Sequence, residues 1–347
     1  MDHPLIRCSA ADGSLVGRFA GLSRPRQLRL LRAAALTGLS AFDVPSGALR
    51  LVQYELNGIY RLSTPSGRFF LRLSTRPDLS VAHIDSEMHW LSRLSEVRRP
   101  VPLLSATGGR AVELSDFPAV VIMTNWLDGA VPRITYDTPL AADYGRIVAA
   151  IHAQADAFTP SAAFVRPSMT FNSITAALVD NLAEVDRILG EGTSGVLTAA
   201  VHRIGRGAPA ETGREILIHG DLHRGNFLST QRGELAVIDF EDCGWGHDLL
   251  DIAAFLDSVA RMDRSDPAGY QTFARRFLDG YTERRPLSGM AEFNDYLALR
   301  DLVVVNYLAR SVNPTVAPWR ARRLRELVGQ LRAYVDTGGY VGAVSVP

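Results

Sequence analysis

The most informative segment of the chain carries His, Asp and Asn at spacings that suit phosphoryl transfer. His219, Asp221 and Asn226 stand in the run Leu-Ile-His-Gly-Asp-Leu-His-Arg-Gly-Asn, and Val-Ile-Asp-Phe-Glu follows with Asp239. In phosphoryl-transfer sites a carboxylate accepts the proton of the attacking hydroxyl, and hard oxygen ligands hold Mg²⁺ at the nucleotide phosphates. The spacing predicts Asp221 as the general base, within a catalytic loop that includes His219. Asn226 and Asp239 are the predicted metal ligands.

The residues around this loop have the composition of two short strands. Residues 215 to 218 and 235 to 238 are rich in Ile, Leu and Val, and residues 229 to 233 between them read Ser-Thr-Gln-Arg-Gly, which is typical of a turn. A strand, a polar loop, a second strand and then Asp-Phe is the order that a phosphoryl-transfer site requires.

His219 and His223 also form a His-x-x-x-His pair, which on a helix would place two zinc ligands on one face. No Glu follows the first His, and Gly220 and Gly225 disfavour a helix here. We therefore expect the His219 ring to hydrogen-bond the backbone around the loop. For His223, a position near the substrate and a purely polar loop role both stay open.

The composition limits where the protein works and what it binds. Lys plus Arg and Asp plus Glu each number 37 among 347 residues, and 47% of the residues are hydrophobic, so nothing favours a nucleic-acid or membrane partner. The two cysteines, Cys8 and Cys243, are far apart and suggest thiols in a reducing compartment. The first residues do not resemble a signal peptide, and no long apolar stretch occurs. We predict a cytoplasmic protein that is a monomer or a homodimer.

The first part of the chain alternates between helical and strand-like patterns. Residues 1 to 22 are rich in Gly and Ser and are predicted to be an N-terminal extension. Thr64 to Gly67 is a turn signal. Apolar spacing predicts helices over residues 24 to 39 and 81 to 94, and strands over residues 49 to 60, 60 to 63, 68 to 73, 101 to 104, 111 to 114 and 119 to 123.

A break at Asn125 to Gly129 separates this strand-rich part from a mostly helical remainder. Apolar positions predict helical segments that include residues 140 to 151 and 174 to 189, and four more helices at about residues 248 to 261, 267 to 284, 290 to 311 and 318 to 335. We expect an N-lobe over residues 23 to 126, which binds nucleotide, and a C-lobe over residues 127 to 347, which holds the catalytic loop and the acceptor site.

With these motifs in place, the chain resembles the aminoglycoside phosphotransferase and choline-kinase-like family. The likeness runs from about residue 49 to 335 and is strongest in His-Gly-Asp-Leu-His-x-Gly-Asn, Ile-Asp-Phe-Glu and the Gly-rich segment that leads to Asp251. It implies an α+β fold, the bilobed protein-kinase-like fold with an antiparallel-sheet N-lobe and a mainly helical C-lobe. It also implies ATP and Mg²⁺, with Asp221 as base and Asn226 and Asp239 as metal ligands. Asp251 would bond the backbone of the catalytic loop from a helix start.

The resemblance extends to a nucleotide site in the front lobe. Arg72 stands where protein kinases carry the Lys that contacts the ATP phosphates, and Glu87 is its apparent partner; a surface ion pair is the alternative. Asn57 and Gly58 lie in a phosphate-covering loop with a single Gly, which offers fewer backbone amides to ATP. Met123 lies in the strand expected to contact adenine, although a Met there is also a common core residue.

We therefore expect an ATP- and Mg²⁺-dependent phosphotransferase that acts on a hydroxyl of a small-molecule acceptor. Two alternatives stay open: a Ser/Thr protein kinase of the bacterial stress-response type on the same fold, and a catalytically weak nucleotide-binding regulator. No Ala-Pro-Glu segment follows Asp239, so the activation segment of typical protein kinases is missing. The zero net charge disfavours polycationic acceptors.

Overall fold

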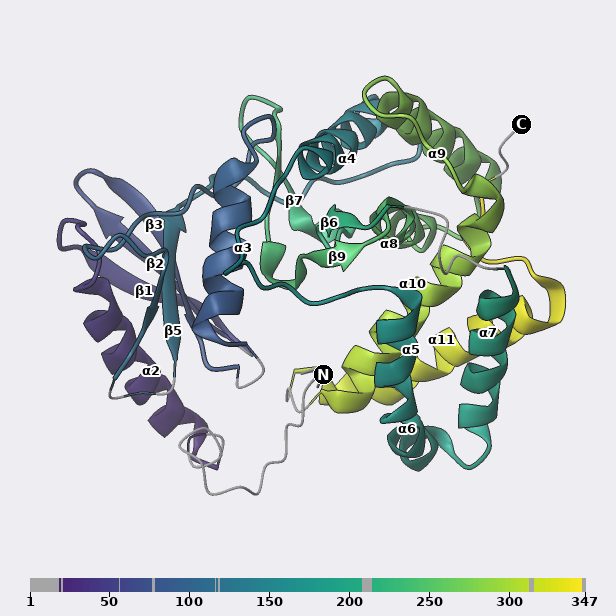
Figure 1. The fold of residues 1–347 in the computed structure, drawn as a ribbon, viewed down its shortest axis with the longest axis horizontal. Coiled ribbons are helices and arrows are strands. Elements are labelled where there is room, and N and C mark those ends of the chain that lie inside the picture. Colours follow the sequence, from purple (N-terminus) through teal and green to yellow (C-terminus); the bar gives the residue numbers. More distant parts are fainter. Residues whose placement is uncertain are drawn as a thin grey trace. The chain divides into compact units, whose positions relative to one another are not determined.

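The structure is a computed structural model that divides into two compact units. One unit comprises Met1–Ser95, Arg99–Asp128 and Pro160–Arg166, and the other comprises Glu96–Arg98, Gly129–Thr159 and Pro167–Pro347 (Figure 1). The described residues are 19, 21–55, 57–76, 79–115, 117, 119–207, 214–311 and 315–344. Within these ranges no helix has the length and apolar character to cross a membrane.

The first unit is built on a five-stranded antiparallel sheet with the strand order β1-β2-β3-β5-β4. The predicted turn is confirmed, because Thr64 pairs with Gly67 and its hydroxyl donates to the Gly67 carbonyl. The strands are β1 (Ala48–Tyr54), β2 (Asn57–Thr64), β3 (Gly67–Ser74), β4 (Ala111–Glu113) and β5 (Val120–Asn125).

The prediction of one strand over residues 49 to 60 is wrong. The chain reverses after Tyr54, which pairs with Gly58, and the N–H of Glu55 donates to the carbonyl of Asn57. The sequence does carry a turn signal here, Asn57-Gly58, but the apolar residues on both sides of it favour one continuous strand.

The predicted strand over residues 101 to 104 is also wrong, although that segment does lie along β5. Leu103 donates to the Met123 carbonyl and Asn125 donates to the Val101 carbonyl, but Pro102 makes only an isolated bridge. Proline has no N–H, so it cannot extend a regular ladder.

Two helices of the first unit agree with the predicted spans. They are α2 (Arg24–Leu39) and α3 (Val81–Arg93), and the Ser80 side chain caps α3 by accepting from the His83 N–H. Side chains of α2 and of the sheet share one core, which contains the fully buried Leu31 and Leu71 and also Phe19. Most of the predicted N-terminal extension, and Cys8, lie outside the described residues.

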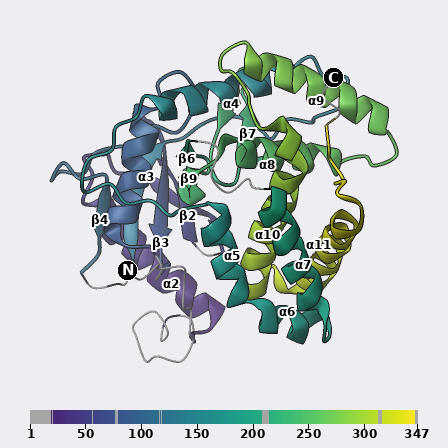
Figure 2. The same cartoon turned by 45° about the vertical axis from the view of Figure 1, so that its right-hand side comes forward.

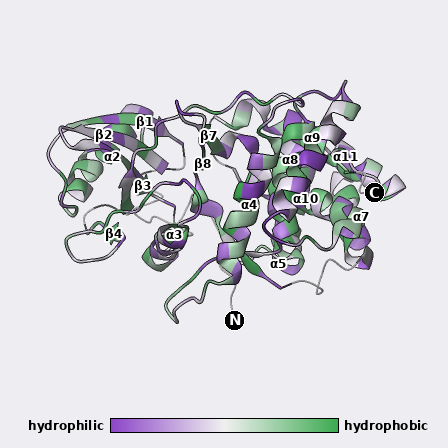
Figure 3. Cartoon of the chain, turned by 90° about the horizontal axis from the view of Figure 1, so that it is seen from above, coloured by the Kyte–Doolittle hydropathy of each residue, from purple (hydrophilic) through white to green (hydrophobic). Residues whose placement is uncertain are grey.

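The described part of the second unit is mainly helical. In Figures 1 and 2, α4 and α9 lie side by side, and α5 lies against α10. In Figure 3 green and purple alternate along α4, as expected for a helix with one buried face. The helices are α4 (Ala141–Asp156), α5 (Phe171–Val179), α6 (Leu182–Leu189), α7 (Thr193–Gly207), α8 (Asp248–Ala260), α9 (Pro267–Thr282), α10 (Phe293–Arg310) and α11 (Ala317–Thr337).

Two small antiparallel pairs of strands interrupt these helices and carry the catalytic segment. The strands predicted on either side of the loop are confirmed as β6 (Ile216–Ile218) and β8 (Leu235–Val237). Their partners are β9 (Gly244–Gly246), which pairs with β6, and β7 (Phe227–Ser229), which pairs with β8.

Two glycines set how closely α4 and α9 approach. A Cβ added at Gly145 would lie 1.9 Å from the carbonyl oxygen of Phe277, and one at Gly280 would lie 2.1 Å from that of Ala142. No real Cβ contact is so short, so both positions require glycine for steric reasons.

We predict that Gly145→Ala lowers the free energy of unfolding by about 3 kcal/mol, the upper end of the usual cost of overpacking. The control is Gly329→Ala in α11, where an added Cβ meets nothing within 4 Å, and which should stabilise by up to about 1 kcal/mol through helix propensity. Urea denaturation measures both. Equal effects of the two substitutions would contradict the close helix contact.

Candidate active site

One carboxylate at the start of α8 holds the catalytic loop in place. Asp251 is fully buried and accepts hydrogen bonds from the backbone N–H groups of His219 (2.7 Å) and Gly220 (2.9 Å). His152 of α4 lies on the same carboxylate, with its Nε2 at 3.2 Å. The bond from Asp251 to the loop backbone that the resemblance implies is therefore present.

The loop backbone passes so close to residue 242 that only glycine fits at position 220. Gly220 has φ +83°, and a Cβ there would lie 2.2 Å from the carbonyl oxygen of Asp242. A positive φ and this close approach both exclude larger residues. Gly220 therefore lets the chain turn sharply between β6 and Asp221.

The two histidines of the loop make different contacts. The Nε2–H of His219 donates to the Ile238 carbonyl at 3.0 Å, as predicted, and ties the loop to the end of β8. Nδ1 of His223 accepts from the Gly225 N–H, so the neutral ring carries its proton on Nε2, 3.6 Å from Oδ2 of Asp221. The loop is not an α-helix, and the zinc arrangement is not formed.

Asp221 lies between two basic side chains. Arg300 of α10 donates to its Oδ1, and His223 faces its Oδ2. Burial would raise the pKa of Asp221, but the charge of Arg300, helped by the histidines, outweighs this and lowers the pKa below its ordinary value. Burial lowers the pKa of His223. Near neutral pH, Asp221 is therefore ionised, and its side chain is 29% exposed.

Sequence reasoning missed Arg300, which lies about 80 positions from Asp221 and in no motif. The available signal was its place in α10, where Arg300 and Asp301 interrupt a buried apolar face that includes Leu299 and Leu302. Charged residues are seldom fully buried unless they have partners.

A backbone hydrogen bond at the end of the β7–β8 ladder brings the segments of the two predicted metal ligands together. The carbonyl of Asn226 accepts from the Ile238 N–H, the residue before Asp239. The side-chain NH₂ of Asn226 donates to the backbone carbonyl of Asp221. The amide oxygen of Asn226 can therefore serve as a ligand for a cation. Asp239 is exposed and has φ +66°, the only positive φ of a non-glycine residue among the described residues. Such backbone strain is common at functional sites.

The ligands Asn226 and Asp239 suit Mg²⁺, which also binds substrate phosphates, better than a metal ion whose ligands all come from the protein. Within the described ranges, no three or more His, Cys, Asp or Glu side chains are grouped so that they could hold a metal ion. Mg²⁺ is commonly bound by one or two carboxylates together with substrate phosphates. Asn226 and Asp239 supply one amide and one carboxylate, a set that nucleotide phosphates can complete.

In the first unit, Arg72 of β3 and Glu87 of α3 form a two-pronged ion pair, with distances of 2.9 and 2.6 Å. The alternative of a surface pair is wrong, since the two residues are only 5% and 1% exposed. Asn57 and Gly58, predicted to lie in a loop, instead begin β2 and pair with Ser74 and Leu73 of β3. Met123 packs in the core of this unit, and its carbonyl accepts from Leu103. Contact of these residues with a nucleotide stays a prediction.

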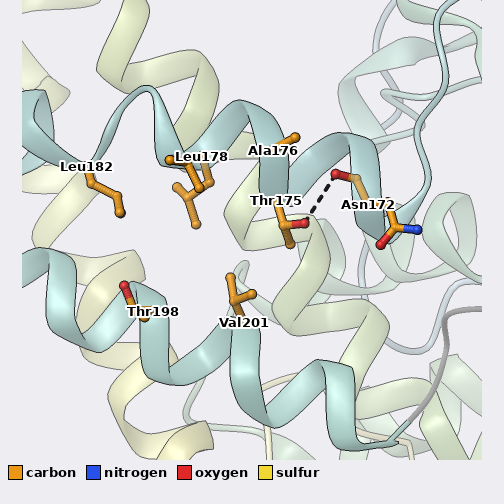
Figure 4. A pocket seen from close by; sticks show the side chains of 8 residues that line it. Asn172, Thr175, Ala176, Leu178, Leu182, Thr198 and Val201 are labelled. Atoms are coloured by element: carbon orange, nitrogen blue, oxygen red, sulfur yellow. Dashed lines mark hydrogen bonds between the residues drawn. The ribbon is translucent and has the colours of Figure 1, made fainter. Parts of the chain in front are cut away.

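A separate pocket of about 300 Å³ lies among α5, α6 and α7 and contains none of these residues (Figure 4). Its side chains are apolar or carry a hydroxyl or amide group, and none is charged. They belong to Asn172, Thr175, Ala176, Leu178, Val179, Leu182, Thr198 and Val201.

Comparison with known proteins identifies the family. The model of the phosphotransferase enzyme family matches residues 55–287, which include the catalytic loop and Asp239. The chain belongs to this family. It is accordingly a phosphotransferase, and the family match also covers Arg72 and Glu87.

Relatives of this phosphotransferase include uncharacterized proteins and one protein named as a kinase. It is 26% identical over 308 residues to an uncharacterized protein of Deinococcus radiodurans, covering 84% of this chain and 86% of that protein. It is 23% identical over 292 residues to amicoumacin kinase of Bacillus subtilis, covering 80% and 83%.

Solved structures show the same fold. The microcompartment-associated aminopropanol kinase has a TM-score of 0.69 and 24% identity, over 89% of this chain and 99% of that chain. An amicoumacin kinase in complex with AMP-PNP, Ca²⁺ and Ami has a TM-score of 0.70 and 19% identity, over 88% and 96%. The phosphotransferase described here thus has the fold of these kinases, as predicted.

The Arg72–Glu87 pair leads to a stability prediction. Arg72→Ala should lower the free energy of unfolding by about 3 to 5 kcal/mol, because it leaves Glu87 charged and buried without its partner. The double variant Arg72→Met with Glu87→Leu should recover most of that loss. Thermal and urea unfolding measure it. If the double variant regains full stability but binds nucleotide weakly, Arg72 contacts the phosphates in addition to its structural role.

The contact of Arg300 with Asp221 leads to a titration prediction. In Arg300→Gln the largest favourable charge is lost while burial remains, so the pKa of Asp221 should rise. The ion pair stabilises the folded protein at pH values above about 3.9, the ordinary pKa of Asp. This stabilisation is lost as the pH falls and Asp221 takes up a proton. Carboxyl ¹³C NMR titration of Asp221 in both proteins measures the shift. An unchanged or lower midpoint in the variant would contradict the pair.

Proposed function

We propose that the protein transfers the γ-phosphoryl group of ATP to a hydroxyl of a small-molecule acceptor, with Asp221 as the general base. The observation that carries this proposal is the position of Asp221: an ionised, part-exposed carboxylate on a loop that Asp251 fixes through two backbone hydrogen bonds. A carboxylate held in this way can accept a hydrogen bond from a hydroxyl and then its proton.

The reaction balances without another co-reactant. The acceptor oxygen forms a bond to the γ-phosphorus while the bond from that phosphorus to the bridging oxygen of ATP breaks, and ADP leaves with the electron pair. The hydroxyl proton passes to Asp221. Asn226 and Asp239 would hold Mg²⁺, which supplies charge neutralisation at the phosphates. Arg72, fixed by Glu87, would contribute a cation to nucleotide binding.

Two observations support a small acceptor over a protein. The relatives include an amicoumacin kinase and the fold neighbours include an aminopropanol kinase, and both names denote small-molecule substrates. No Ala-Pro-Glu segment follows Asp239, whereas protein kinases use one in their activation segment. ADP release with a panel of small alcohols, and with a generic protein substrate, distinguishes the small-molecule enzyme from a protein kinase and from a weak regulator.

Asp221→Asn should abolish acceptor-dependent ADP release while the fold and ATP binding persist, because the substitution removes the base and keeps its shape. Steady-state kinetics and calorimetry measure the two properties. Asp263→Asn is the matched control, because Asp263 is exposed and its side chain accepts hydrogen bonds from Ser265 only, among the described residues. Activity within about tenfold of the unmodified enzyme would rule out Asp221 as an essential base.

Asp239→Ala should weaken Mg·ATP binding more than Asn226→Ala does, because Asp239 contributes a formal charge to the cation and Asn226 only a dipole. Both variants should bind nucleotide without Mg²⁺ as the unmodified protein does. Calorimetric titration with and without Mg²⁺ tests this. Two variants that respond to Mg²⁺ normally would place the metal elsewhere.

A further inference from the structure

Arg300 has more hydrogen-bonding capacity than the protein uses. Its side chain is 10% exposed, and within the described ranges it donates one hydrogen bond, to Oδ1 of Asp221. A guanidinium group carries five N–H donors in a planar fork. None of the Arg300 nitrogens is among the described buried polar atoms that lack a hydrogen-bond partner, so its remaining N–H groups reach solvent. They are available to an acceptor that enters beside the catalytic carboxylate.

The neighbouring carboxylates do not use these donors. Asp257 of α8 pairs with Arg261, and Asp301, the next residue of α10, accepts from the Tyr340 hydroxyl. No ion pair links either of them to Arg300 within the described residues. Among the described residues, Asp221 is thus the carboxylate that Arg300 hydrogen-bonds.

His223 presents an N–H group at this position. Its Nδ1 accepts from the Gly225 N–H, so its Nε2 carries a proton and lies 3.6 Å from Oδ2 of Asp221. The two oxygens of Asp221 therefore have different neighbours: Oδ1 accepts a hydrogen bond from Arg300, while Oδ2 faces the His223 ring at 3.6 Å, beyond hydrogen-bond distance. A hydroxyl that approaches Oδ2 would bring the rest of the acceptor close to the fork of Arg300.

We propose that Arg300 binds an anionic group of the acceptor, a carboxylate or a phosphate, while the acceptor hydroxyl lies on Asp221. This inference rests on the proposed function and names its substrate class: a small hydroxylated anion. Because Arg300 and Asp221 are hydrogen-bonded to each other, a short acceptor, for example one with a three-carbon chain, can contact both groups through hydrogen bonds of ordinary length. Arginine suits this role because its fork matches both oxyanions. An ammonium group placed there would be repelled.

The test uses acceptors that share a three-carbon skeleton and differ in charge. They are 3-hydroxypropionate, 3-hydroxypropyl phosphate, 1,3-propanediol and 3-amino-1-propanol. Each is titrated into the full chain with saturating Mg·ADP, which prevents transfer, and the arginine Nε–H signals are followed by TROSY NMR. The Arg300 signal is assigned by its loss in Arg300→Gln. Arg310 of the same helix, which bonds Asn181, serves as the internal control.

We expect at least one of the two anions to shift the Arg300 signal and to bind at least tenfold more tightly than the diol or the amine, with Arg310 unchanged. Which anion binds more tightly distinguishes a carboxylate from a phosphate acceptor. The preference should be lost in Arg300→Gln and kept in Arg310→Gln. Asp221→Asn should bind the anion more tightly, because the guanidinium loses its competing carboxylate.

Equal affinity for all four compounds, or a preference that survives in Arg300→Gln, would overturn the inference. So would an absence of anion binding to the unmodified protein. The proposed function fails separately: Mg·ADP is titrated first, and a chain that does not bind it is not the proposed enzyme. The anion titration is then run without nucleotide and still decides the role of Arg300.

Discussion

The active-site loop depends on the buried carboxylate of Asp251. The strand β6 ends at Ile218, and the next two backbone N–H groups would be buried without partners if this carboxylate were absent. Such groups cost about 1 to 3 kcal/mol each. Because Asp251 lies in the first turn of α8, the orientation of Asp221 is fixed by that helix and by its tertiary packing. The conformation of the loop therefore does not depend on bonds within the loop alone.

Two of the arginine–carboxylate pairs have opposite character. Arg72 and Glu87 use both prongs of the guanidinium and both carboxylate oxygens, and both residues are buried. Arg300 donates a single bond to Asp221, whose side chain is part-exposed. The first pair uses both carboxylate oxygens and holds β3 rigidly against α3. In the second pair a bound ligand can also contact the two side chains, so the interaction energy of the pair depends on what enters the site.

The parts that sequence predicts well are those whose chemistry is local. The loop motif, the turn at Thr64 to Gly67 and most helices follow from residues that lie near each other in the chain. The reversal after Tyr54 is missed although Asn57-Gly58 follows it, because the apolar residues on both sides favour a single strand. Pro102 shows the opposite case. Its segment is apolar enough to predict a strand, but proline has no N–H to donate, so a regular ladder does not form. Arg300 is a tertiary feature: only the packing of α10 brings it to Asp221.

The contact between α4 and α9 also limits how this enzyme can evolve. At Gly145 and Gly280 one helix meets backbone atoms of the other, so there is no side chain that could shift to make room for a methyl group. A larger residue at either position becomes acceptable only if the helices move apart, and His152 on α4 would then move relative to Asp251. Divergence of this helix pair is therefore linked to the geometry of the catalytic loop, and substitutions far from Asp221 can be under selection for turnover.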